Sequence, residues 1–61
     1  MIIVEKAVQN KKIVINSELI EFIEEIPETV ITLTTGKKII VKERKEEIIE
    51  LVVNYKRAVL I

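Results

Sequence analysis

The segment 27–43, PETVITLTTGKKIIVKE, decides the fold because it places the only proline and the only glycine of the chain on either side of one short strand. Pro27, with the acidic residue after it, predicts a chain reversal. Gly36 supplies the positive φ that a tight hairpin or a bulged loop needs. The β-branched residues between them predict a strand over about 29–34, and KIIVK predicts the returning strand over about 38–42. Pro27 and Gly36 are therefore expected to be the two corners of a β-meander.

The N-terminal half predicts three more strands. Residues 2–8 are rich in isoleucine and valine, the polar break QNKK follows, and IVIN predicts a short partner strand over 12–15. NSELI is typical of a helical turn, for which Asn16 or Ser17 is the expected cap. EFIEEI alternates in residue type and predicts a strand over 21–26, with a continuation of the turn as the alternative.

The C-terminal part predicts an amphipathic helix over about 44–58. Its apolar residues recur at helical spacing, in a stripe made of Ile48, Leu51, Val52, Tyr55 and Val59. Glu46 and Glu47 fall in its first turn and Lys56 and Arg57 near its end, which suits the helix dipole.

Residues 1–61 are therefore expected to form a single α+β domain, with a small antiparallel β-meander sheet of about four to five strands followed by one C-terminal amphipathic helix. One helix covers one face of such a sheet, yet the two central strands contain apolar residues at positions that point to both faces. The uncovered face and the helix tail predict a protein interface made of Val30, Thr32, Ile40, Tyr55, Val59 and Leu60.

The size of the chain favours self-association. A domain of 61 residues buries only about 60% of its unfolded surface, and small domains compensate with disulfides, a metal or oligomerisation. The sequence has no cysteine and no histidine, although 49% of its residues are hydrophobic. A homo-oligomer is the expected solution.

The residue types predict no catalytic, cofactor or metal site, and hence no enzyme. Ser17 is the only serine, and no histidine is present to activate it. The adjacent acidic pairs Glu24–Glu25 and Glu46–Glu47 point away from one another on a strand or a helix, so we expect neither pair to form an acid/base dyad.

Two other kinds of partner are alternatives. A basic cluster could form a phosphate-binding edge in a small RNA-binding regulator, and it consists of Lys37, Lys38, Lys42, Arg44 and Lys45. A formal net charge of zero and the scarcity of aromatic residues count against nucleic acid. The C-terminal helix could make the chain a peripheral membrane adaptor, but its polar face is not markedly basic. Because the sequence has neither a signal-peptide pattern nor an apolar run of about 18 residues, a cytoplasmic protein is expected.

The segment 16–43 resembles the small FlbD-type flagellar proteins, also called the swarming motility protein SwrD family. The resemblance is carried by Met1-Ile2, Asn16, Leu19-Ile20-Glu21, Ile23-Glu24, Pro27, Thr29-Val30-Ile31-Thr32-Leu33, Gly36-Lys37-Lys38 and Val41-Lys42-Glu43. It implies a non-enzymatic bacterial protein that serves flagellar motility, with a motor or stator protein as a partner at the cytoplasmic face of the motor.

The chain departs from the family pattern at three positions. Asn10 stands where the family tends to have glycine, in a first hairpin that is one residue longer. Glu28 replaces an aspartate, and Arg44 replaces the serine that would cap the final helix. Of these changes, Arg44 is the one expected to weaken a local structure, because arginine is a poor N-cap.

Overall fold

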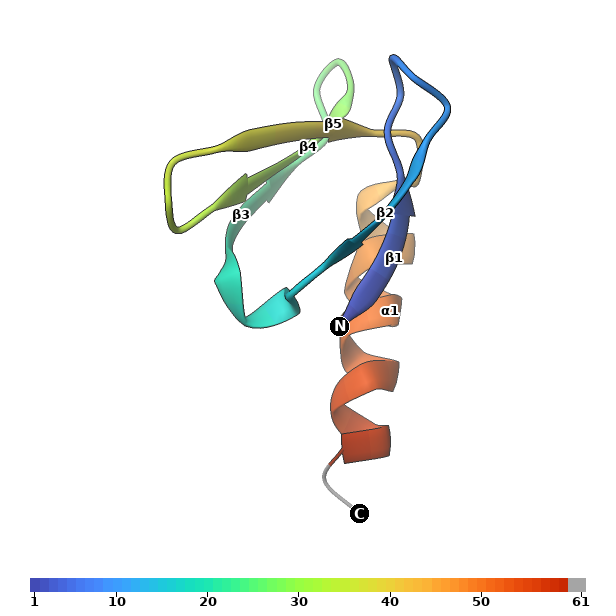
Figure 1. The fold of residues 1–61 in the computed structure, drawn as a ribbon, viewed down its shortest axis with the longest axis vertical. Helices are drawn as coiled ribbons and strands as arrows, with labels where there is room; N and C mark the ends of the chain where they lie inside the picture. Colours follow the sequence, from blue (N-terminus) through green and yellow to red (C-terminus); the bar gives the residue numbers. More distant parts are fainter. Residues whose placement is uncertain (60–61) are drawn as a thin grey trace.

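Alternating burial in the strands and a helical stripe after them produce the α+β class predicted from the sequence. The computed structural model describes residues 1–59 (Figure 1). Within these residues the elements are β1 (Ile2–Glu5), β2 (Lys12–Ile15), the 3₁₀ turn η1 (Ser17–Leu19), β3 (Ile20–Glu24), β4 (Thr29–Leu33), β5 (Lys38–Val41) and α1 (Lys45–Val59). The largest difference from the expected boundaries is the first strand, which ends at Glu5 and not near residue 8.

The strands form two antiparallel sheets, whereas one sheet was expected. β3, β4 and β5 form the predicted meander, and β1 pairs with β2. The turn η1 redirects the chain after β2, so that β3 begins a separate sheet. The two sheets meet where the chain leaves β1: Lys6 forms a bridge with Val41, and the N–H of Ala7 donates to the carbonyl of Ile40 at 3.0 Å.

Two residues of the turns have a positive φ, and for Gly36 this is the predicted conformation. Gly36 has a φ of 92° and Asn10 a φ of 50°. The side chain of Asn16 accepts a hydrogen bond from the backbone N–H of Glu18 at 3.1 Å, so Asn16 and not Ser17 caps the 3₁₀ turn. The Ser17 side chain is buried instead.

The core lies between the two sheets and the helix. Its buried members are Ile2, Val4, Ile15, Ile31, Ile39, Val41 and Ile48. Leu51, Val52 and Tyr55 extend the contact of α1 with this core, and β1 lies along α1 (Figure 1). Four of the five residues of the predicted stripe of α1 therefore pack against the core, and the fifth, Val59, is exposed. The helix leaves the far face of the three-stranded sheet without cover. Over residues 1–59, no helix has both the length and the apolar character needed to cross a membrane.

Candidate interaction surface

The register of the three-stranded sheet places six side chains on its face away from the core. Phe22, Thr32 and Lys38 are directly paired across β3, β4 and β5, and so are Glu24, Val30 and Ile40. Directly paired residues point to the same face of a sheet. The intervening positions Ile23, Ile31 and Ile39 point to the core. We call the first set the open sheet face: Phe22, Glu24, Val30, Thr32, Lys38 and Ile40.

The open sheet face contains the three strand residues that the sequence predicts for an interface, with different accessibilities. Ile40 is 36% exposed and Val30 is half-buried. Thr32 is only 7% exposed, since it lies in the central strand between the longer side chains Phe22 and Lys38. Among residues 1–59 its hydroxyl has no hydrogen-bond partner. Thr32 therefore lies at the centre of this face but contributes little accessible surface.

Phe22 is the one apolar residue of this face that the sequence did not predict for the interface. Its side chain is 57% exposed, and it lines a hollow together with Glu21, Glu24, Thr32 and Lys38. The alternating pattern of residues 21–26 predicted the strand, but the facing direction of Phe22 follows only from its pairing with Thr32. A bulge between Ile20 and Phe22 shifts that pairing, and such irregularities have no clear sequence signal.

The predicted helix residues do not join the open sheet face. Tyr55 packs against the core, on the opposite side of the sheet from Ile40. Val59 is exposed near the end of α1, and Leu60 lies outside the described residues. The predicted interface thus divides into a sheet part and a helix part that face different directions.

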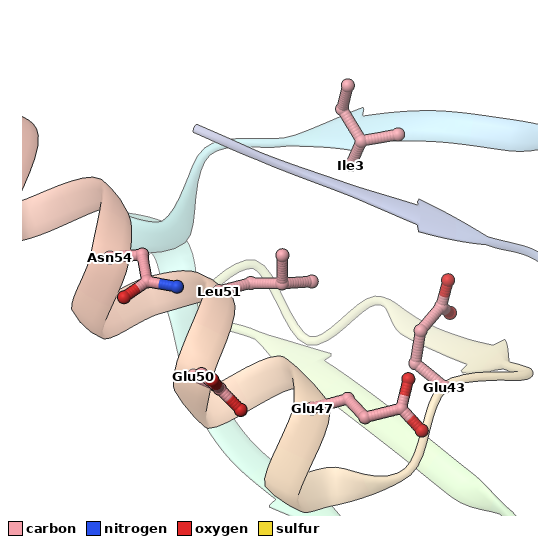
Figure 2. Close-up of a pocket in the computed structure, with 6 residues that line it drawn as sticks. All are labelled: Ile3, Glu43, Glu47, Glu50, Leu51 and Asn54. Atoms are coloured by element: carbon pink, nitrogen blue, oxygen red, sulfur yellow. The ribbon is translucent and has the colours of Figure 1, made fainter.

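A second surface feature is an acidic hollow between β1 and α1 (Figure 2). Its volume is about 420 Å³, and its lining residues are Ile3, Glu43, Glu47, Glu50, Leu51 and Asn54. Over residues 1–59, no three histidine, cysteine, aspartate or glutamate side chains are grouped so that they could hold a metal ion. The hollow is an open depression with acidic side chains around an apolar floor.

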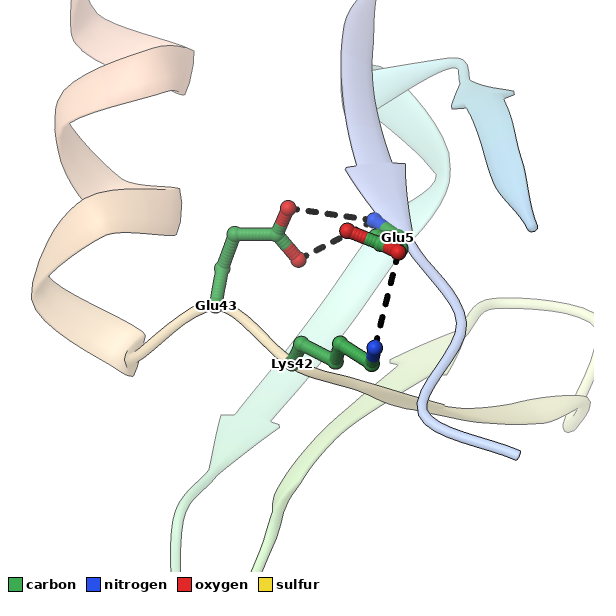
Figure 3. Close-up of polar contacts among 3 residues, drawn as sticks. All are labelled: Glu5, Lys42 and Glu43. Atoms are coloured by element: carbon green, nitrogen blue, oxygen red, sulfur yellow. Dashed lines mark hydrogen bonds and ion pairs between the residues drawn. The ribbon is translucent and has the colours of Figure 1, made fainter. Parts of the chain in front are cut away.

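Glu43 in this hollow already has a structural task (Figure 3). Both of its carboxylate oxygens lie 3.1 Å from the backbone nitrogen of Glu5, whose N–H donates to them. The Glu5 carboxylate lies 3.5 Å from Nζ of Lys42, and the N–H of Lys42 donates to the Glu5 carbonyl at 2.9 Å. Glu5, Lys42 and Glu43 therefore fasten β1 to the connection between β5 and α1.

The comparison with protein families identifies the chain. The model of the FlbD family, described as flagellar and swarming motility proteins, matches residues 1–60. The chain belongs to the FlbD family. This confirms the resemblance found in the sequence, and it gives the protein a role in flagellar or swarming motility. Comparison with curated proteins and with solved structures gave no match.

In this FlbD-family chain, the predicted basic cluster is divided by local ion pairs. Lys42 pairs with Glu5, and Nε of Arg44 lies 3.8 Å from a carboxylate oxygen of Glu25. Lys37 and Lys38 lie at the start of the meander's last strand, next to Lys6 and Ile40. Two of the five residues of the cluster therefore lie beside carboxylates.

The members of the acidic pair Glu24–Glu25 point in different directions, as the sequence predicts. Glu24 lies on the open sheet face, whereas Glu25 turns toward the helix start and accepts a hydrogen bond from the Lys45 N–H. Glu47 accepts a hydrogen bond from the Arg44 N–H at 3.4 Å. Glu25 and Glu47 of this FlbD-family chain thus accept hydrogen bonds from the backbone at the helix start.

Proposed function

We propose that the chain serves flagellar motility as a non-enzymatic protein-interaction module that works as a homo-oligomer, with the open sheet face as its contact surface. The observation that carries this proposal is the exposure of Phe22 and Ile40 on a sheet face that the helix does not cover. Apolar side chains grouped on one uncovered face are typical of a binding surface.

The free energy available at this face supports the proposal. Full burial of a phenylalanine or isoleucine side chain contributes about 1.5–3 kcal/mol relative to leaving it exposed. Phe22 and Ile40 are exposed in the isolated chain, so their burial against a partner would still contribute much of this free energy. Val8, which lies beside Ile40 and Lys38 and is also exposed, extends the apolar surface past β5.

The partner in the cell is, in this proposal, a component of the flagellar motor or its stator, contacted from the cytoplasmic side. The family description supports the flagellar part of this statement. The small size of the chain and its uncovered apolar face support contact and not catalysis as the mode of action.

Replacing Ile40 with glutamate tests the proposal. The variant Ile40→Glu puts a charge into the open sheet face, so swarming of the producing cells should be lost while the folded protein persists. The matched control is Val14→Glu, which places the same charge at an exposed valine of β2 outside this face. Full swarming with a folded Ile40→Glu protein would overturn the proposed contact surface.

Light scattering tests the homo-oligomer. The wild-type chain is expected to have a mass of at least two subunits, and a stable monomer at micromolar concentration would remove the oligomer from the proposal. The circular dichroism spectrum of each variant shows whether it is folded.

A further inference from the structure

The open sheet face has a charge pattern that fits a second copy of itself. Resting on the function proposed above, we infer that two chains pair face to face through this surface, so that β3 of one chain lies across β5 of the other. The occupant of the face is thus another copy of the same chain, held in a symmetric dimer.

The argument begins with the charges of the two outer strands. β3 has Glu24 on the open sheet face, and Glu21 lines the same hollow. β5 has Lys38 on this face, with Lys37 next to it in the chain. β4 between them contributes only Val30 and Thr32 to the face. The surface is therefore acidic along one edge, uncharged in the middle and basic along the other edge.

Two-fold symmetry can place the acidic edge of one chain against the basic edge of the other. Two sheets that stack as identical copies are related by a two-fold axis in the plane between them. When the axis runs along β4, the acidic β3 of each chain faces the basic β5 of the other. When it runs across the strands, β3 faces β3 and β5 faces β5, so that like charges meet. Like charges held together oppose association, and the charge pattern therefore selects the axis along β4.

The individual side chains agree with the axis along β4. Directly paired residues of the three strands form a row across the sheet, and rotation about an axis along β4 places each row over the same row of the other chain. The Phe22 ring of one chain therefore comes over the partner's Lys38, which permits a cation–π contact. Glu24 lies one row away from the same lysine, within reach of its long side chain. The aligned packing that sheets commonly adopt, with a small angle between strands, is compatible with this arrangement.

The central strand β4 of one chain lies over β4 of the other chain, along the two-fold axis. Val30 comes to the partner's Val30, and Thr32 comes to the partner's Thr32. The Thr32 hydroxyl has no hydrogen-bond partner within residues 1–59, and a second hydroxyl can both donate and accept. The same arrangement thus covers the exposed apolar residues of this face and brings a polar group toward Thr32, which with Ser17 is one of two buried hydroxyls without a partner among the described residues.

Reversing one charge at a time tests the pairing. The variants Glu24→Lys and Lys38→Glu each create like charges at both symmetric contacts, and each should dimerise at least about tenfold more weakly than the wild type. An equimolar mixture of the two variants should regain the mass of two chains, because both contacts in the mixed dimer again join opposite charges. Sedimentation velocity at several concentrations measures these masses.

The matched control is a charge reversal at exposed positions outside the face. The variants Lys11→Glu and Glu18→Lys change the net charge by the same amounts, and both should dimerise like the wild type. Recovery of the dimer only in the mixture of the two face variants is the expected result.

A dimeric wild type whose face variants also dimerise normally would overturn this inference, and so would a monomeric wild type. The first outcome leaves the proposed homo-oligomer standing, with self-association through another surface, whereas the second also removes the homo-oligomer from the proposed function. Failure of the proposed function has a different signature, namely normal swarming with a folded Ile40→Glu protein.

Discussion

A carboxylate oxygen of Glu25 accepts a hydrogen bond from the backbone N–H of Lys45 at 3.0 Å, although the two residues are 20 positions apart. The first N–H groups of a helix have no partner within the helix, and a side chain at the N-cap position commonly accepts from one of them. At that position this chain has Arg44, whose side chain has no acceptor atom. Glu25, in the connection between β3 and β4, supplies the acceptor from a distant part of the chain, and its charge also suits the positive end of the helix dipole.

Removing the Glu25 carboxylate should lower the stability of the fold. The variant Glu25→Ala is expected to reduce the free energy of unfolding by about 1 kcal/mol, the usual effect of losing an N-cap. Chemical denaturation monitored by circular dichroism measures it. Glu28→Ala removes an exposed carboxylate from the same connection and should change little.

A second substitution tests the coupling between Glu25 and position 44. Arg44→Ser introduces a side chain that can cap α1 locally and removes the ion pair with Glu25, so the loss caused by Glu25→Ala should be smaller in that background. An equal loss in both backgrounds would mean that Glu25 stabilises the protein in another way.

Much of the fold was predictable because its signals are local. Gly36 adopts the predicted positive φ, and β4 and β5 form the predicted hairpin around it. The helical stripe identified the packed side of α1 from Ile48 to Tyr55, although not at Val59. Alternation predicted that Ile31 and Ile39 point away from Val30 and Ile40. Each of these features is decided by a few neighbouring residues.

The features that escaped prediction depend on residues far apart in the sequence. The bridge between Lys6 and Val41 and the hydrogen bond from Glu5 to Glu43 join the N-terminus to the helix start. The accessibility of Phe22 and the burial of Thr32 depend on which residues stand opposite them in the neighbouring strands. No local pattern specifies such pairings. For this reason the sequence predicted that one face of the sheet is the candidate surface, but it did not predict all the residues of that face.

Gly36 should be required for its backbone conformation alone. Its φ of 92° is unfavourable for any residue with a Cβ atom, yet a Cβ placed there would have no atom within 4 Å. Gly36→Ala is therefore expected to cost about 1 kcal/mol of unfolding free energy with no steric contribution. Thermal denaturation measures this loss, and Asn10→Gly, at the other positive φ, should be tolerated. An unchanged stability of Gly36→Ala would contradict the positive φ.

Glu43 should stabilise the junction between β1 and the helix start. Its carboxylate is the acceptor for the Glu5 N–H, and Glu43→Ala leaves this partly buried donor without its partner, at an expected cost of about 1–2 kcal/mol. Glu43→Gln keeps an acceptor and should lose less. Glu50→Ala, which removes an exposed carboxylate from the same hollow, serves as the control. Hydrogen exchange of the Glu5 amide provides a local measurement, because its protection should fall in Glu43→Ala and stay unchanged in Glu50→Ala.

Ile48 and Ile49 are adjacent in α1 but have opposite surroundings, so they form a matched pair of positions. Ile48 is fully buried, whereas Ile49 is 51% exposed. Ile48→Ala should cost about 2–5 kcal/mol, which approaches the roughly 3–9 kcal/mol expected for a whole domain of 61 residues. Ile48→Val should lower the free energy of unfolding by about 0.5–1.5 kcal/mol, a loss small enough to be measured on a protein that still folds.

The same change at Ile49 decides whether burial is the cause. Ile49→Val removes an identical methylene from a surface position and should change the unfolding free energy by less than about 0.5 kcal/mol. Unfolding must be followed at several protein concentrations, because dimerisation would make the apparent stability of every variant depend on concentration. Equal losses at the two positions would indicate that Ile49 is covered in solution, and a loss at Ile49 that vanishes on dilution would place that cover in a neighbouring subunit. Such a result would locate an interface on α1 and away from the open sheet face.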